Sequence, residues 1–188
     1  MAAPRKPVDP PTPEQTAFLE RAVERYGKAT YNFAYRLTRN EADARDLTQE
    51  AFIRVYRSWR SFKPGTSFLS WIYRIVTNLQ RDELRRQKGR YLVEILQDNE
   101  PRAFAGNRPL AEDPIGDYVE GHFSEPVSKA LEALSAEQRQ IVVLADIEEC
   151  SYQEIAEIVG CSIGTVRSRL HRARGQLRRL VTRHLKSS

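Results

Sequence analysis

The residues best suited to chemistry in this sequence are the arginines of the segment from residue 162 to residue 180. Apolar residues recur there at steps of three and four, so a 3.6-residue helix gathers them into one narrow stripe. The opposite face carries Arg167, Ser168, His171, Arg172, Arg174, Arg178 and Arg179. The chain contains no Asp or Glu after Glu157. A helix with one buried seam and one unbalanced basic face predicts binding to a polyanion.

The residues just before this helix favour DNA as the polyanion. Residues 152–160 have the pattern of a short amphipathic helix that Gly160 ends in a left-handed conformation. Cys161 and Ser162 then form a very short turn, in which Ser162 is placed to cap the next helix. A short helix, a tight turn and a second helix make a helix-turn-helix, whose second helix enters the major groove.

Side chains near the start of that second helix are the ones expected to reach base edges. They are Thr165, Arg167, Ser168, His171 and Arg172. An arginine can bond two acceptors of guanine at once, which gives sequence choice as well as affinity. Arg169 lies at the edge of the apolar stripe and is expected to reach a phosphate, and Arg174 extends the same basic face. The alternative is a solvated basic helix in an ordinary bundle.

Composition supports a nucleic-acid partner. The 188 residues carry a formal charge of +5, and the basic residues crowd into residues 74–90 and 167–186. Residues 92–125 instead carry eight acids against two arginines. No apolar run has membrane-spanning length and the amino terminus lacks a signal-peptide core, so we expect a soluble, cytoplasmic protein without membrane insertion. Cys150 and Cys161 flank the first helix of the helix-turn-helix and are expected to be small buried residues. The alternative is a metal site that they form with His171, but their spacing matches no zinc pattern.

Two helices are expected in the amino-terminal half, after a proline-rich tail at residues 1–13. Helical periodicity covers residues 14–38, with Val23 among the expected core residues, and residues 41–57. The second of these helices has a strongly polar outer face, formed by Asp43, Asp46, Gln49, Glu50 and Arg54. Such a face is usually only solvated, but its acids are also well placed to meet a basic partner surface.

A loop around Pro64 and Gly65 is flanked by the aromatic residues Trp59, Phe62, Phe68 and Trp71. Aromatic rings beside a loop, followed by an arginine-rich helix, are what stacking on unpaired bases requires. Composition alone nevertheless favours a core position for most of these rings, and Phe68 and Trp71 could take either role. The helix is expected over residues 67–87. Its predicted outer face carries Tyr73, Arg74, Asn78, Arg81, Asp82, Arg85 and Arg86.

Residues 90–125 contain scattered Pro, Gly, Asp and Asn without a sustained period, apart from a short helix suggested at residues 91–97. A linker of this length is unusual inside a compact domain, so we expect two domains. Helices are expected at residues 126–134 and 135–147, ahead of the helix-turn-helix, and Ser135 with Gln138 has a capping-box pattern. The prediction is an all-α fold, with helical domains at residues 14–89 and 126–188.

Three stretches together resemble bacterial RNA polymerase sigma factors of the extracytoplasmic-function (ECF) type, in the sigma-70 family. The first stretch is D-A-R-D-L-T-Q-E-A-F-I-R-V-Y-R, which begins at residue 43. The second is the spacing of Phe62, Phe68 and Trp71, followed by Y-R-I at residues 73–75. The third is Y-Q-E-I-A-E-I-V-G-C-S-I-G-T-V-R-S-R-L-H-R-A-R, which begins at residue 152. The resemblance covers nearly the whole chain apart from the tail and the linker. It implies sigma region 2 joined to sigma region 4, with no region 3 between them.

The resemblance also implies partners and roles. Such a factor binds core RNA polymerase, through the clamp helices of the largest (β′) subunit and through the β subunit, and directs it to promoters. The polar face of residues 43–54 would dock on the clamp helices. The loop and helix of region 2 would open the −10 element with Lys63, Ser67, Phe68, Trp71, Tyr73, Arg74, Asn78, Arg81 and Arg85. The helix-turn-helix would read the −35 element, and the acidic linker would thread toward the active-site and RNA-exit channels.

An anti-sigma factor is a further partner that the resemblance implies. No cofactor, metal or small-molecule substrate is expected, because the chain lacks a phosphate-cradling glycine loop and acid pairs with metal-like spacing. One alternative is a helix-turn-helix transcriptional regulator that acts without polymerase. Another is a nucleic-acid-processing enzyme. Such an enzyme would need a metal site or a set of acid and base groups, whereas the three histidines of this sequence, His122, His171 and His184, are scattered along the chain. We therefore expect a protein that is not an enzyme.

Overall fold

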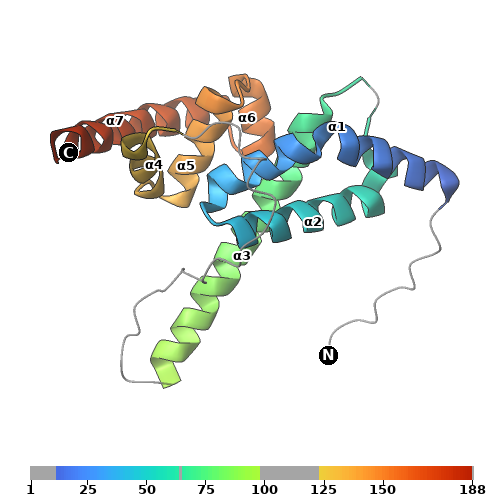
Figure 1. The fold of residues 1–188 in the computed structure, drawn as a ribbon, viewed down its shortest axis with the longest axis horizontal. Helices are drawn as coiled ribbons and strands as arrows, with labels where there is room; N and C mark the ends of the chain where they lie inside the picture. Colours follow the sequence, from blue (N-terminus) through green and yellow to red (C-terminus); the bar gives the residue numbers. More distant parts are fainter. Residues whose placement is uncertain (1–11, 64, 98–122, 188) are drawn as a thin grey trace.

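The computed structural model describes residues 12–63, 65–97 and 123–187, and these residues form helices without a strand. The amino-terminal domain contains α1 (Pro13–Thr38), α2 (Glu41–Ser58), the 3₁₀ turn η1 (Trp59–Ser61) and α3 (Phe68–Gln97). The carboxy-terminal domain contains α4 (Glu125–Glu132), α5 (Ala136–Val142), the π-type turn η3 (Val143–Ile147), α6 (Tyr152–Val159) and α7 (Ile163–Ser187). The predicted all-α fold is confirmed (Figure 1).

Local capping chemistry sets where α1 and α2 begin. The Thr12 hydroxyl accepts from the Gln15 N–H at 3.2 Å, and the Asn40 side chain accepts from the Asp43 N–H at 3.0 Å. Between these helices Arg39 adopts the left-handed conformation, with φ of 58°, and its N–H bonds the Tyr35 carbonyl. The chain therefore reverses within two residues, and α1 packs along α2.

Helix α3 extends further than its sequence pattern indicates. That pattern predicts an end near residue 87 and a linker from residue 90, whereas the helix continues through Gly89 to Gln97. A glycine inside a helix costs only about 1 kcal/mol, which the strong helix formers on both sides offset. In Figure 1 the second half of α3 projects from the body of the protein.

Each domain has its own apolar centre. In the amino-terminal domain Phe33, Leu37, Val55, Ile72 and Val76 are completely or almost completely buried. In the carboxy-terminal domain the equivalent residues are Ile141, Leu144, Ile155, Val166 and Leu170. The prediction of Val23 as core is wrong, because 45% of this residue is exposed on the outside of α1.

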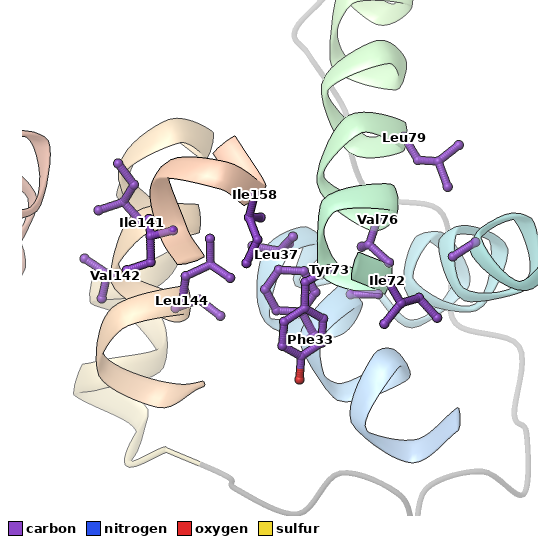
Figure 2. Packing of buried hydrophobic residues seen from close by; sticks show 14 of the residues in the cluster. Phe33, Leu37, Ile72, Tyr73, Val76, Leu79, Ile141, Val142, Leu144 and Ile158 are labelled. Carbon is purple, nitrogen blue, oxygen red and sulfur yellow. The ribbon is translucent and has the colours of Figure 1, made fainter. Parts of the chain in front are cut away.

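The two domains pack against each other in the structure. Helix α6 contacts α3, and both α5 and η3 contact α1. Figure 2 shows Leu144 and Ile158 of the carboxy-terminal domain close to Leu37, Phe33 and Tyr73 of the amino-terminal domain. The residues of the proline-rich tail up to residue 11, and those of the linker from residue 98 to residue 122, lie outside the described residues.

Candidate nucleic-acid and polymerase interfaces

The turn between α6 and α7 has the geometry of a helix-turn-helix. Gly160 has a φ of +75°, and its N–H and that of Cys161 both bond the Ala156 carbonyl, at 2.9 and 3.0 Å. The Ser162 hydroxyl then accepts from the Thr165 N–H at 3.1 Å, so it caps α7 as predicted. Gly160 therefore ends α6 and Ser162 caps α7 two residues later, so the chain turns within very few residues and the first turns of α7 lie at the surface.

Helix α7 divides into a buried stripe and an exposed basic face. Val166, Leu170 and Ala173 are buried, as the periodicity predicted. Five side chains are expected to reach base edges. All of them except Thr165 are exposed, namely Arg167, Ser168, His171 and Arg172. Thr165 and Arg169 are half-buried at the margin of this face. The exposed guanidinium and imidazole groups therefore share one surface that is free of carboxylates on α7 itself.

Arg174 differs from the other predicted −35 residues because it has a carboxylate partner within its own domain. Its guanidinium forms a salt bridge with Asp146, in which both Nε and Nη2 donate. This hydrogen bond with Asp146 raises the pKa of Arg174 above its ordinary value. The salt bridge ties α7 to η3, so Arg174 has a role in domain packing as well as its predicted place on the basic face.

The predicted aromatic loop forms a packed cluster at one end of α3. The Phe68 ring stacks on Tyr26 at 4.5 Å between centroids, and lies 5.5 Å from Phe62 and 5.6 Å from Trp71. Phe68 is 7% exposed, which corresponds to the core alternative for this ring. Trp71 is half-buried and keeps part of its surface open to solvent. Of the two rings, Trp71 has the accessible surface that base stacking requires.

Tyr73 lies on the inner side of α3, so its predicted place on the outer face is wrong. It is 3% exposed and stacks on Phe33 at 4.1 Å between ring centroids. Its hydroxyl donates to Glu148 Oε2 at 2.5 Å. Burial raises the pKa of Tyr73, and the hydrogen bond to Glu148 adds to that effect. Periodicity missed this position because Glu148, the group that makes burial of the hydroxyl favourable, lies 75 residues away.

The remaining predicted −10 residues form a polar and basic surface along α3. Arg74, Arg81 and Arg85 are exposed on the helix, and Lys63 and Ser67 are exposed in the loop before it. The Ser67 hydroxyl also accepts from the Ser70 N–H at 3.2 Å, which caps the start of α3. Asn78 is half-buried, and its Oδ1 accepts from Arg81 Nη2 at 2.5 Å. These side chains can supply phosphate donors and base contacts from one face.

The polar face of α2 is at the surface. Asp43, Asp46, Gln49 and Arg54 are exposed, and the half-buried Glu50 pairs with Arg54 at 3.4 Å, one helical turn away. Such an exposed pair contributes little to stability, about 0.3–0.5 kcal/mol. This face therefore offers a set of accessible acceptors and one cation, which suits contact with another protein.

An apolar groove beside this face was not predicted from the sequence. It lies between α1 and α2, and its volume is about 1070 Å³. Two apolar residues at its edge are unusually open, with 45% of Val23 and 43% of Ile53 exposed. The other apolar and aromatic residues along it are Leu19, Tyr31, Phe52 and Tyr56. The residue that could have indicated this groove in the sequence is Ile53, an apolar residue that lies outside the apolar stripe of its own helix.

Metal ligation and membrane crossing find no support in the part of the chain that the structure describes. There, no three His, Cys, Asp or Glu side chains come together as metal ligands could. None of the helices described is both long enough and apolar enough to cross a membrane.

The family models for sigma-70 region 2 and sigma-70 region 4 match residues 22–90 and 124–177. The ECF RNA polymerase sigma factor SigW of Bacillus subtilis is 33% identical over 168 residues, which cover 88% of this chain and 89% of SigW. This chain belongs to the ECF sigma factors. The ECF sigma factor SigE of Mycolicibacterium smegmatis is 44% identical over 164 residues, or 86% of this chain, which spans 61% of the length of SigE.

A solved structure shares the fold of this ECF sigma factor. The sigma factor RpoE of Bartonella quintana, in complex with the anti-sigma factor NepR, superposes with a TM-score of 0.70 at 26% identity. The match covers 89% of this chain and 98% of the RpoE chain. The two matched regions correspond to the two helical domains, so the predicted pairing of sigma regions 2 and 4 is confirmed.

Proposed function

We propose that this ECF sigma factor binds core RNA polymerase through the outer face of α2 and reads promoters with its two domains. Region 2 would melt the −10 element with the exposed side chains of the loop and of α3. Region 4 would read the −35 element through Arg167, Ser168, His171 and Arg172. The observation that carries this proposal is the exposed basic face at the start of α7, on a helix-turn-helix with complete end caps.

Physical chemistry supports a division of labour between the domains. Flipping a base out of its stack costs a few kcal/mol, and a stacking ring with nearby cations offsets that cost. Trp71 and the arginines of α3 supply those groups, whereas the arginines of α7 suit intact major groove. The chain would accordingly act as a polymerase subunit in the cytoplasm, with no reaction of its own. An anti-sigma factor, as in the Bartonella quintana complex, is the regulatory partner we propose.

Binding to purified core polymerase tests the polymerase part of the proposal. The full chain should co-elute with core polymerase in size-exclusion chromatography, and the double variant Asp46→Ala, Gln49→Ala should weaken that association at least about tenfold. A matched control is Glu137→Ala with Glu157→Ala, which changes two exposed polar residues in the other domain. Equal binding by both variants would place the polymerase contact elsewhere. No association with core polymerase, together with tight dimeric binding to duplex DNA, would favour the regulator.

A further inference from the structure

The groove between α1 and α2 exposes apolar side chains that folding ordinarily buries. Val23 and Ile53, at its edge, are 45% and 43% exposed, although both lie inside regular helices. Its volume is about 1070 Å³, and the rings of Tyr31, Phe52 and Tyr56 line it. An apolar patch of this kind, with polar residues around it, marks a site where another segment of polypeptide binds.

One end of this groove lies where the amino-terminal tail joins α1. Gln15 Nε2 donates to the Tyr56 carbonyl at 2.7 Å, which places the first turn of α1 beside the last turn of α2. Figure 1 shows the two helices side by side, with α1 beginning near the end of α2. Residues 1–11 join the described chain at Thr12, close to this end of the groove. The tail therefore has a high effective concentration at the groove.

The tail has the sequence period of a polyproline II helix. Pro4, Pro7 and Pro10 are spaced by three residues, which is one turn of that helix, so their rings would share one face. Thr12, the first described residue, has polyproline II dihedral angles, with φ of −74° and ψ of 150°. Proline-rich segments bind grooves lined by aromatic side chains, because their conformation is formed before binding and little entropy is lost. The rings of the groove therefore suit the prolines of the tail.

The length of the tail fits the groove. Eleven residues in polyproline II conformation span about 34 Å, whereas α1 rises about 29 Å between Thr12 and Tyr31 at the far end of the groove. A tail that runs back along α1 could thus follow the groove to its end. In that register Lys6 lies about 19 Å from Thr12, which is the level of Glu24, an exposed acid of the groove. The charges of Lys6 and Glu24 are complementary.

We propose that the groove between α1 and α2 is the docking site of the chain's own proline-rich tail, residues 1–11, which binds there in polyproline II conformation. The docked tail covers the exposed edge formed by Val23 and Ile53. Gln49 lines this groove and also belongs to the polar face of α2 that is proposed to bind polymerase. If that proposed function holds, the tail and core polymerase compete for one surface, and the tail lowers the apparent affinity for polymerase.

Disulfide cross-linking within the full chain tests the docking without polymerase. The test variant carries Val8→Cys and Ile53→Cys, because Ile53 is one helical turn into the groove from its tail end. The matched control pairs Val8→Cys with Arg57→Cys, at an exposed position on α2 that does not line the groove. Every variant also carries Cys150→Ala and Cys161→Ala, so that no other thiol is present. Circular dichroism in the far ultraviolet establishes folding, and mass spectrometry follows the disulfide after oxidised glutathione is added.

Docking predicts that the pair at positions 8 and 53 forms its disulfide at least about tenfold faster than the pair at positions 8 and 57. A tail that only diffuses near the start of α1 would reach both positions on α2. Equal rates for the two pairs, or faster reaction at position 57, would therefore overturn the docking.

The triple variant Pro4→Ala, Pro7→Ala, Pro10→Ala tests the conformation of the tail, because it keeps the length and the charge and removes the prolines. Added to the pair at positions 8 and 53, it should slow the disulfide at least about threefold, since the segment then loses more entropy on binding. An unchanged rate would overturn the polyproline II mode of binding.

Titration with core polymerase tests the competition. In the otherwise native chain the triple proline variant should bind polymerase about three to ten times more tightly than wild type, the values for a tail docked in about two-thirds to nine-tenths of the molecules. Equal affinities would overturn the competition. If neither chain binds polymerase, the proposed function fails, whereas the cross-linking rates still decide whether the tail docks.

Discussion

Arg167 is the first arginine of α7, and its side chain is exposed beside the turn of the helix-turn-helix. We expect Arg167→Ala to cost about 1–3 kcal/mol in binding to the −35 element and to relax the choice at one base pair. Binding of the polymerase holoenzyme to promoters with single changes in that element measures both effects. Arg178→Ala is the control, because it removes an equal charge further along α7. Equal loss on every sequence would show that Arg167 contacts only phosphate.

Cys150 is a half-buried residue whose ionisation opposes folding. Burial raises the pKa of its thiol to about 11 from an ordinary 9.0, with further repulsion from Glu154 and Glu148. Between these values the folded chain keeps a proton that the unfolded chain loses, so the free energy of unfolding falls as pH rises. The melting temperature of wild type should therefore fall more steeply than that of Cys150→Ala between about pH 9 and 11. Parallel curves throughout that window would contradict the assignment.

At the scale of single residues, the sequence could predict exposure on α7 but not on all of α3. The acid-free face of α7 lies opposite a regular apolar stripe, so periodicity alone places Arg167 and His171 at the surface. Tyr73 has no such local signal, because its burial depends on a carboxylate in the other domain. For Phe68 the sequence allows either base stacking or a core position, and packing against Tyr26, Phe62 and Trp71 accounts for its burial.

At the scale of elements, the turn between α6 and α7 depends on one glycine. Gly160 has a positive φ, and a Cβ added there would have open space around it, so a side chain is disfavoured by the backbone alone. Gly160→Ala should lower the free energy of unfolding by about 1–2 kcal/mol. Urea denaturation followed by circular dichroism measures the change.

Gly175 provides the matched comparison for that substitution. It lies inside α7, and an added Cβ would meet only the end of the Arg179 side chain at 3.9 Å. Gly175→Ala should therefore stabilise the chain by about 0.5–1 kcal/mol, since it reduces the entropy lost on folding. If Gly160→Ala stabilised the chain as Gly175→Ala is expected to, the turn would not depend on the left-handed conformation.

The starts of the helices were more predictable than some of their ends. Ser135 and Ser151 each precede a Gln or Glu by three residues, and both form complete capping boxes in the structure. The first of these boxes was predicted from its sequence pattern. The sequence pattern predicts that the helix ends near residue 87, just before Gly89, but α3 runs through this glycine to Gln97. A single glycine is a weak stop signal where no competing turn follows it.

At the scale of the whole molecule, two helical domains could be predicted because helical periodicity lapses between them. Their docking could not, since it depends on pairs such as Arg36 with Glu148 and Ser70 with Glu154, which are far apart in sequence. The apolar groove between α1 and α2 was missed for a related reason. Its exposed edge, Val23 and Ile53, becomes visible only when the two helices are placed side by side.

Promoter specificity supplied to core RNA polymerase is the central property expected of this ECF sigma factor. Run-off transcription tests it most directly, with purified core polymerase, with and without the full chain, on DNA fragments that include the region upstream of its own gene. We expect transcripts of defined length that appear only with the chain and that Arg167→Ala reduces. Specific binding of the chain alone to duplex DNA as a dimer, with no transcripts from any fragment, would contradict this expectation.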